Sequence, residues 1–251
     1  MDKLAFFQQL LTALAEQQPA VAATVVQAGA ETGLPGVAPG NRCLWSTDRH
    51  YGSLGMADLD AAVAGRAGEV LAGRRPRLET VELAGGSVTV FLEPVRPEPE
   101  VIVLGGGHVG QQVAAAAKLA GYRVTVIDDR PDFASPALFP AADRIICRDF
   151  AAALQEVKIN PATYIVIVTR GHRYDYACLQ AVITSPAAYI GMIGSRRRIK
   201  GVKERLQAGG VPEAALARVH APIGLDIGAE TPAEIAISIL AEIIRVYRRG
   251  A

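Results

Sequence analysis

The sequence lacks a long apolar run. The longest apolar stretches, TYIVIV and AISILAEII, are bounded by polar residues and fall well short of the ~18 residues that a membrane-spanning helix needs. The N-terminal segment also fails as a secretion signal, because Gln8 and Gln9 interrupt its apolar stretch and Glu16 stands near the place of a cleavage site. We therefore expect an amphipathic helix there, and a soluble protein without membrane segments.

Cysteine and net charge are also scarce. The three cysteines, Cys43, Cys147 and Cys178, are far apart and form no CxxC pair, which is typical of a reducing compartment and argues against a structural zinc site. The net charge is +1, with no basic tail and no low-complexity tract. These features predict a cytoplasmic protein that binds neither a metal ion nor nucleic acid.

The chain of 251 residues, half of them hydrophobic, is long enough for two modest domains. The segment EPVRPEPE at residues 93–100 contains three prolines, which favour an extended linker. We therefore expect one domain at residues 1–95 and a second at residues 96–251. The first carries 7 basic and 10 acidic side chains and the second 19 and 15, so the second is the half that attracts anions.

The first half predicts a small α+β domain. Its pattern favours helices over residues 2–16 and 57–72, strands at residues 22–28 and 43–45, and a loop rich in glycine and proline at residues 29–40. ETVEL and VTVFLEPV alternate on either side of AGGS, as the strands of a hairpin do.

The second half alternates short apolar strands with helices. The predicted strands are VIVL, RVTVID, RIIC, TYIVIVT and AAYIGMIG, and a long helix follows at residues 231–247. This order predicts a doubly wound, parallel, Rossmann-like sheet, whose ligands bind at the carboxyl ends of the strands.

The motif GGGHVG follows the first of these strands and opens a helix. Gly105, Gly107 and Gly110 have the spacing of a phosphate-binding turn, in which the backbone approaches the phosphate closely and helix amides point at it. His108, in the first helical turn, stands near the positive end of the helix dipole, which favours its neutral form. It either faces the ligand or caps a loop carbonyl.

Asp128 ends the next strand, about 20 residues further on, where an acidic side chain commonly binds a ribose hydroxyl. The neighbouring Asp129 and Arg130 leave this role open. The interpretation as a dinucleotide site is therefore weaker than the prediction of the fold, which hosts many ligands.

The stretch TRGHRYD follows the fourth strand. It brings Thr169, Arg170 and His172 to the same edge of the sheet as the glycine loop. Asp175 lies three residues after His172 on one helix face, a spacing that suits either a proton shuttle or an ordinary hydrogen bond on the helix surface.

The fifth strand leads into GSRRR. Gly194 precedes Ser195, which has the character of an N-cap, and Arg196, Arg197 and Arg198 fill the first helical turn. Cations at this position oppose the helix dipole unless an anion is bound, so a phosphate or pyrophosphate site is one interpretation. A solvated basic face or a patch that binds a partner is the other.

Two features stand near the C-terminus. Thr231, Pro232 and Glu234 form a capping box, so Glu234 is expected to be structural. The preceding PIGLDIGAE is apolar, punctuated by glycine and carries Asp226, and such a loop is suited to cover a ligand.

Taken together, GGGHVG, TRGHRYD, YIGMIGSRRR and PIGLDIGAETPAEIAISILAEI resemble the carboxyl half of the XdhC/CoxI family of xanthine dehydrogenase accessory proteins, over residues 100–245. The resemblance implies a chaperone rather than an enzyme, which binds the molybdenum cofactor (molybdopterin). It also implies two partners: a cysteine desulfurase, with which an oxo ligand is exchanged for sulfur, and the molybdenum hydroxylase that receives the cofactor. The motifs and the resemblance together predict a cofactor site with no catalytic residue and no metal ligand. Its residues would be Gly105, Gly107, His108, Gly110, Asp128, Thr169, Arg170, His172, Gly194, Ser195, Arg196, Arg197, Arg198 and Asp226.

The amino half matches this family less well. The family has a cysteine after a glycine pair in its first domain, whereas Met56, Ala57 and Asp58 stand at that place here. Cys43 is the cysteine nearest to the missing one. If the family cysteine handles molybdenum or sulfur, this chain does so without it.

Two other functions remain open. The glycine loop and Asp128 also fit an NAD(P)-dependent oxidoreductase. However, none of the seven tyrosines is followed four residues later by lysine, so the proton-donating Tyr-x-x-x-Lys pair of short-chain dehydrogenases is missing. A domain that senses a nucleotide and signals through its first half is the third interpretation. The apolar terminal helix and the edge of the hairpin favour a homodimer.

Overall fold

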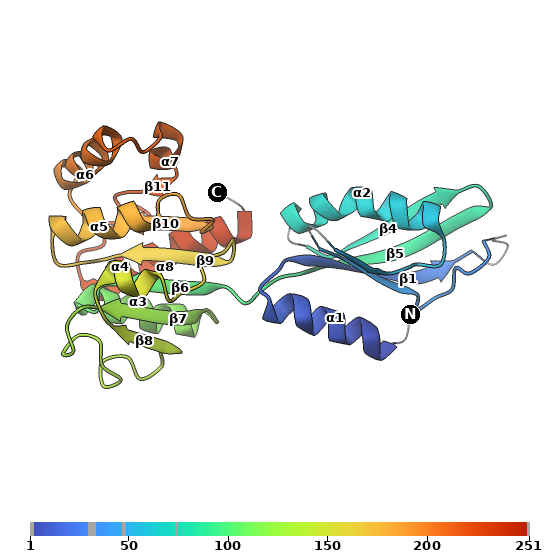
Figure 1. Cartoon of the computed structure of the whole chain (residues 1–251), viewed down its shortest axis with the longest axis horizontal. Coiled ribbons are helices and arrows are strands. Elements are labelled where there is room, and N and C mark those ends of the chain that lie inside the picture. Colours follow the sequence, from blue (N-terminus) through green and yellow to red (C-terminus); the bar gives the residue numbers. More distant parts are fainter. Residues whose placement is uncertain (1–2, 30–33, 47–48, 74, 250–251) are drawn as a thin grey trace. The chain divides into compact units, whose positions relative to one another are not determined.

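The computed structural model describes residues 3–29, 34–46, 49–73 and 75–249 (Figure 1). Residues 30–33 of the expected loop at 29–40 lie outside the described residues, as do the side chains of Lys3, His172, Arg173 and Arg249. The chain divides into two compact units, Met1–Pro97 and Glu98–Ala251. Among the described residues, no helix has both the length and the apolar character needed to cross a membrane.

The first unit is an antiparallel sheet with the strand order β3-β2-β1-β5-β4 and an apolar core on each face. Side chains alternate along β1: Ala20 and Ala22 join the core beneath α1, whereas Val21 and Ala23 join the core beneath α2. The elements are α1 (Lys3–Ala15), β1 (Ala20–Ala28), β2 (Arg42–Ser46), β3 (His50–Gly52), α2 (Ala57–Gly73), β4 (Arg77–Leu83) and β5 (Gly86–Val95).

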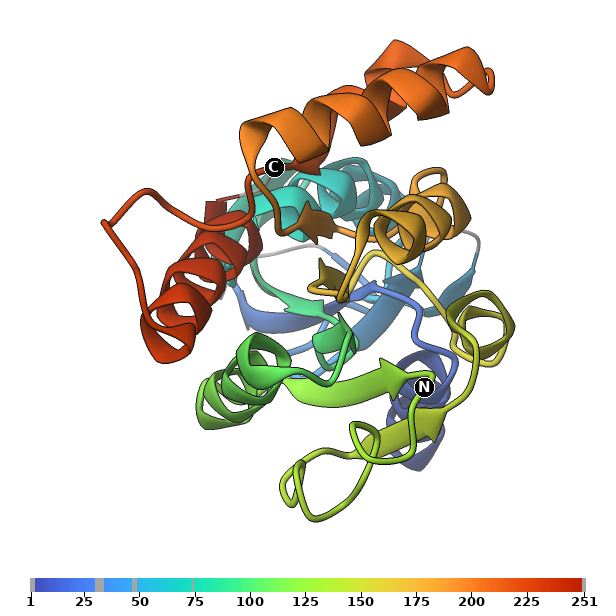
Figure 2. The same ribbon diagram turned by 90° about the vertical axis from the view of Figure 1, so that its left-hand side faces the viewer.

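The second unit is a parallel sheet with the order β11-β10-β9-β6-β7-β8 (Figure 2). Its strands and first helices are β6 (Glu100–Leu104), α3 (His108–Leu119), β7 (Arg123–Asp128), β8 (Arg144–Cys147), α4 (Phe150–Leu154) and β9 (Thr163–Ile167). They are followed by α5 (His172–Val182), β10 (Tyr189–Met192), α6 (Arg196–Ala208), α7 (Glu213–Ala217), β11 (Val219–His220) and α8 (Pro232–Arg249).

Helices cover both faces of this sheet. Val101 and Val103 of β6 pack in the core that α3 and α8 form, and Ile102 and Leu104 pack in the core that α4, α5, α6 and α7 form. The predicted doubly wound fold is therefore confirmed, and the strands β6, β9 and β10 are largely apolar because both faces of the sheet are buried there.

The structure departs from the sequence-based expectation in its shortest elements and in the linker. β3, β11 and α7 were not expected, and each has only two to five residues. The expected linker at residues 93–100 is shorter, since Pro94 pairs with Val21 inside β5. β4 accompanies β5 only as far as Leu92, so Pro94 has a neighbouring strand on one side alone, where a residue without an amide proton is tolerated.

Candidate functional site

The glycine loop lies where the chain order of the parallel sheet reverses. β6 and β9 are neighbours, with β7 and β8 on one side and β10 and β11 on the other. The helices that follow β6 and β9 lie on opposite faces, and this divergence opens a crevice at the carboxyl ends of the two strands. The loops at residues 105–107 and 168–171 border the crevice.

The three glycines of the motif meet three different requirements. Gly105 has a φ of +116°, and a Cβ there would lie 2.5 Å from the carbonyl oxygen of Val168. A Cβ on Gly110 would lie 2.0 Å from the carbonyl oxygen of Gly105, so this glycine lets α3 pack closely on its strand. A Cβ on Gly107 would meet no described atom within 4 Å. A side chain at Gly107 would therefore point into open space.

The two helices at the crevice begin without a side-chain cap from the residues that the structure describes. α3 has Gly107 as its N-cap and α5 has Gly171. In contrast, Asp149 caps α4 and the predicted N-cap Ser195 is confirmed on α6. The capping box of α8 is confirmed as well, because Thr231 and Glu234 bond to each other's amides. α7 also begins without a side-chain cap from the described residues, at Pro212, so free amides are present in the first helical turns at the switch point but are not confined to it.

Asp128 is fully engaged within the protein. One carboxylate oxygen accepts the amide of Gly106 at 2.8 Å and Nη2 of Arg130 at 3.0 Å, and the other accepts the amide and Nε of Arg130 at 3.0 and 2.9 Å. Burial would raise the pKa of Asp128, but these hydrogen bonds hold it below its ordinary value. This aspartate orders the glycine loop, and it would have to give up a bond to bind a ribose.

Arg170 is the basic side chain best placed at the crevice. Its Nη2 donates to Asp129 at 3.1 Å and to the hydroxyl of Tyr174 at 2.8 Å. Asp129 follows β7 and Arg170 follows β9, so this ion pair joins the loops on either side of β6. His108, the first residue of α3, is exposed.

Thr169 and Asp175 form a buried pair. The hydroxyl of Thr169 donates to Asp175 at 2.6 Å, and Arg198 forms an ion pair with the same carboxylate. The expected contact between His172 and Asp175 lies outside the described residues, since His172 is placed only by its backbone, as the first residue of α5. Asp175 thus connects the start of α5 with the start of α6.

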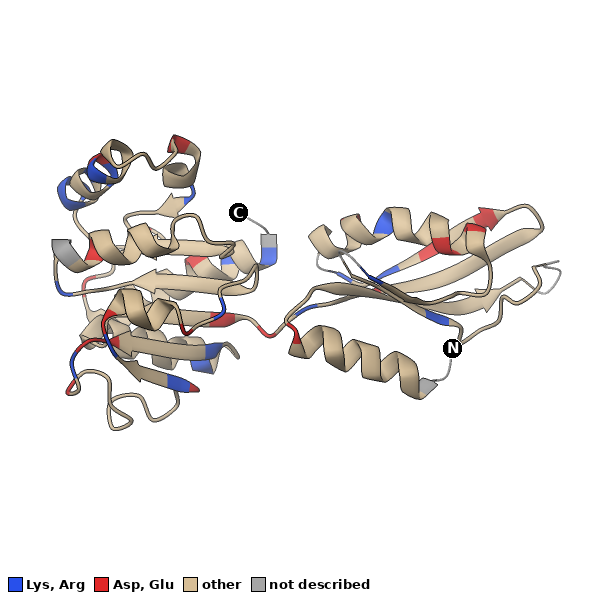
Figure 3. Ribbon diagram, in the orientation of Figure 1, with Lys and Arg blue, Asp and Glu red and all other residues tan. Residues whose placement is uncertain are grey.

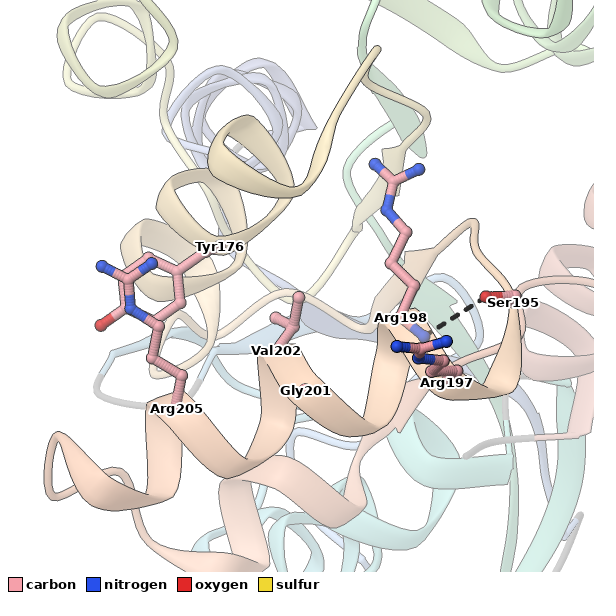
Figure 4. A pocket seen from close by; sticks show the side chains of 7 residues that line it. All are labelled: Tyr176, Ser195, Arg197, Arg198, Gly201, Val202 and Arg205. Carbon is pink, nitrogen blue, oxygen red and sulfur yellow. Dashed lines mark hydrogen bonds between the residues drawn. The ribbon is translucent and has the colours of Figure 1, made fainter.

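The three consecutive arginines line two different pockets rather than one. Arg197 and Arg198 line a pocket of about 540 Å³ with Ser195 and Arg205, and the two side chains leave the first turn of α6 in different directions (Figure 4). Arg196 lines a pocket of about 390 Å³ along residues 222–229. Successive residues of a helix point about 100° apart, which explains the division. Gly194, with a φ of +156°, precedes this turn.

The loop that carries Asp226 is attached to α8 by hydrogen bonds. The amide of Gly224 donates to Glu242 at 2.9 Å, and the hydroxyl of Ser238 bonds to the carbonyl of Leu225. Asp226 itself is exposed and lines the same pocket as Arg196. Glu242 was missed in the sequence, where its only signal is a single acid in an apolar helical run.

Cys43 of the first unit is unsuited to act as a thiolate. Its sulfur is buried, 2.8 Å from Nε2 of His50, and burial together with the charge of Asp60 raises its pKa to about 12. The thiol therefore stays protonated at neutral pH. His50 in turn stacks on Trp45 at 5.4 Å between the ring centres.

The strand order, the glycine loop and the uncapped helices define this unit as a Rossmann domain. The family model described as the XdhC Rossmann domain matches residues 101–243. The chain therefore belongs to the XdhC family, as the motifs of the second half predict.

Known proteins resemble the chain as follows. The uncharacterized protein YqeB of Escherichia coli is 34% identical over 207 residues, which cover 78% of this chain and 38% of that protein. A probable xanthine dehydrogenase subunit of Bacillus subtilis is 33% identical over 165 residues, covering 66% of this chain and 48% of that protein. The chain thus spans less than half the length of either relative. A solved structure described as a xanthine dehydrogenase from Bacillus halodurans shares the fold, with a TM-score of 0.55 at 22% identity, and the match covers 96% of this chain and 95% of that one.

Proposed function

We propose that this protein is an accessory factor of a xanthine dehydrogenase-type molybdenum hydroxylase and binds the molybdenum cofactor in its second unit. Membership of the XdhC family and the likeness to a probable xanthine dehydrogenase subunit support the accessory role. The observation that carries the binding role is the open direction at Gly107, together with the uncapped starts of α3 and α5 on either side of the switch point.

These features fit the phosphate of a pterin cofactor. Backbone amides and the positive ends of two helix dipoles converge where Gly107 leaves room, and Arg170 supplies a guanidinium beside them. In this proposal the amides of Gly107 and His108 hold the phosphate, and Arg170 and His172 border the rest of the ligand. The bound cofactor would carry the molybdenum that the hydroxylase uses for its redox chemistry.

The partners of this proposal are the hydroxylase and a cysteine desulfurase. A desulfurase is invoked because the thiols of the chain are poor sulfur carriers: Cys43 and Cys178 are buried, and burial raises the pKa of both. Cys147 is exposed, but it ends β8, the edge strand, two positions from β6. The exposed side chains of Ile237 and Ile244 on α8 support a homodimer in solution.

The test is to replace Gly107 by Ala and by Val in protein co-expressed with the cofactor pathway. At a φ of −69° both residues are sterically allowed, so the fold is retained while the new side chain enters the phosphate position. We expect molybdenum and pterin to copurify with the original protein and to be lost stepwise in the two variants. Gly68→Ala is the control, since it also faces open space but lies in α2. Equal retention in all four proteins would rule out the glycine loop as the site.

The order of the sheet strands also favours a second function, an NAD(P)-dependent oxidoreductase or a domain that senses a nucleotide. In chain order it reads 3-2-1-4-5-6 from β8 to β11, as in dinucleotide-binding domains. A fluorescence titration with NADH separates these functions from the first, because a carrier of molybdopterin alone gives no saturable signal. A nucleotide sensor would in addition change its oligomeric state on size-exclusion chromatography with nucleotide.

A further inference from the structure

One face of α6 lines a basic pocket that does not include the loops at the switch point. Arg197, Gly201 and Arg205 follow one another at intervals of four residues, and Arg198 and Val202 form the adjacent row. Tyr176 of α5 and the N-cap Ser195 complete the lining of this α5–α6 pocket, which measures about 540 Å³ (Figure 4). Figure 3 shows basic residues gathered along the same helix.

Two of the three arginines of the α5–α6 pocket, Arg205 and Arg198, are held in place by contacts within the protein. The guanidinium of Arg205 stacks on the ring of Tyr176, 4.0 Å from its centre (Figure 4). Stacking uses the face of a guanidinium and leaves the N–H groups at its edge to bind an anion. Arg198 is positioned by its ion pair with the buried Asp175.

The charge of the pocket is only partly balanced. Asp175 compensates Arg198, and Glu204 pairs with Lys200 rather than with an arginine of the pocket. Among the residues that the structure describes, neither Arg197 nor Arg205 forms an ion pair. Two uncompensated cations therefore flank a concave surface whose middle residue is glycine.

The α5–α6 pocket is hollow at Gly201 because this residue has no side chain. A Cβ added there would meet no described atom within 4 Å, so any side chain at this position would project into free space between the two arginines. Glycine inside a helix costs about 0.5–1 kcal/mol relative to alanine. The helix thus retains an unfavourable residue where a side chain would occupy the pocket.

We infer that the α5–α6 pocket binds a compact dianion, a phosphate monoester, at a site separate from the glycine loop. Its volume is that of a small-molecule site, and guanidinium groups that line one hollow are a common means by which proteins bind phosphate. This inference goes beyond the proposed function. The phosphate belongs either to a free metabolite or to a bound cofactor, and the chemistry of recognition is the same for both.

The test is a titration of the full-length ¹⁵N-labelled chain with inorganic phosphate and with phenyl phosphate, at constant ionic strength set by chloride. We expect saturable shifts of the amides of residues 197–205. Arg197→Gln and Arg205→Gln each remove a charged donor and should weaken binding about tenfold. Lys200→Gln removes the same charge from an exposed position that does not line the pocket, and it should change the affinity less than about twofold.

Substitutions that add a side chain without changing the charge distinguish phosphate binding in this pocket from binding at the glycine loop. Gly201→Ala should stabilise α6 and still weaken phosphate binding, whereas Gly107→Ala should leave the shifts in α6 unchanged. Protein that copurifies with pterin forms a last arm. Further saturable shifts indicate a free phosphate monoester as the ligand of this pocket. Their absence indicates that the phosphate of the cofactor lies in this pocket, which would overturn its assignment to the amides of Gly107 and His108.

Three results would overturn the inference. The first is the absence of saturable shifts in cofactor-free protein, and the second is an equal loss of affinity in Lys200→Gln and Arg205→Gln, which would reveal diffuse attraction only. The third is a response of residues 197–205 to a poly-aspartate peptide but not to phosphate, which would make this face a surface for binding an acidic protein.

Discussion

Nη2 of Arg170 lies 3.1 Å from Oδ2 of Asp129, across the end of the strand that leads into the glycine loop. An incoming phosphate competes with this carboxylate for the guanidinium and is repelled by it. Asp129→Asn should therefore strengthen the binding of pyrophosphate by about three- to tenfold, as measured by isothermal titration calorimetry. Asp132→Asn, a change of the same charge on an exposed neighbour, is the control. An equal gain in both variants would mean that net charge alone is responsible.

The ion pair of the buried Asp175 with Arg198 predicts a non-additive loss of stability. Asp175→Asn leaves a half-buried guanidinium without its counter-charge and should lower the free energy of unfolding by about 3 kcal/mol. Asp175→Asn combined with Arg198→Gln should lose less than the sum of the two single changes. Urea unfolding followed by circular dichroism measures the effect, and Trp45, the single tryptophan, reports the first unit as an internal reference. Additive losses would show that the two side chains do not stabilise each other.

Glu242 predicts a dependence of stability on acid. Burial would raise its pKa, but hydrogen bonds from His220, Tyr189 and the amide of Gly224 lower it from 4.5 to about 2. The lowered pKa means that ionised Glu242 stabilises the folded state above pH 4.5. That stabilisation, about 3 kcal/mol, is lost as the pH falls through about 2.

The measurement compares the original protein with Glu242→Gln in urea between pH 7 and pH 2. The variant should be less stable at pH 7, and the difference should shrink below pH 4.5. The groups that face this carboxylate are His220, Tyr189 and Arg245, and all three are retained in both proteins. A stability difference between the two proteins that stays constant with pH would contradict the lowered pKa of Glu242.

Gly110 and Gly107 should respond in opposite ways to the same substitution. Gly110→Ala places a methyl group 2.0 Å from the carbonyl oxygen of Gly105 and should cost several kcal/mol, about 2–4, because the backbone of the glycine loop must move. Gly107→Ala should change the thermal midpoint little, because its methyl group enters open space. Differential scanning calorimetry distinguishes the two, and similar losses would refute the different roles of these glycines.

The cysteines should differ in their reactivity. Cys147 is exposed, whereas Cys43 and Cys178 are buried with raised pKa values. A disulfide reagent that releases a coloured thiolate should label one thiol rapidly and the other two only on unfolding. Cys147→Ser should remove the rapid phase. Rapid labelling of a second thiol would show that one buried cysteine is accessible in the folded protein.

Most of the fold was predictable because its signals are local. The strand at residues 101–104, the helix start after Gly107 and the cap at Ser195 each follow from a few neighbouring residues. The assignment of the three arginines to two different pockets could also have been predicted, since three consecutive residues of a helix cannot point in one direction. In the sequence, Arg196, Arg197 and Arg198 form one group because they occupy one helical turn.

The remaining contacts of the site depend on distance in space. Asp129 and Arg170 are 41 residues apart, and Tyr189 and Glu242 are 53 apart, so nothing local indicates these pairs. Asp128 is an intermediate case. Its partner Arg130 is two residues away, but its bond to the amide of Gly106 depends on the pairing of β6 with β7.

The division of the arginines makes α6 an adaptable element. Arg196 and Arg197 point into separate hollows although they are adjacent in the chain, so a single substitution alters one hollow and leaves the charge of the other unchanged. Insertion of one residue before the helix would rotate every side chain about the helix axis by about 100° and change which pocket each arginine lines. Point substitutions can therefore change the two pockets beside this helix independently, whereas changes in the length of the preceding loop change both together.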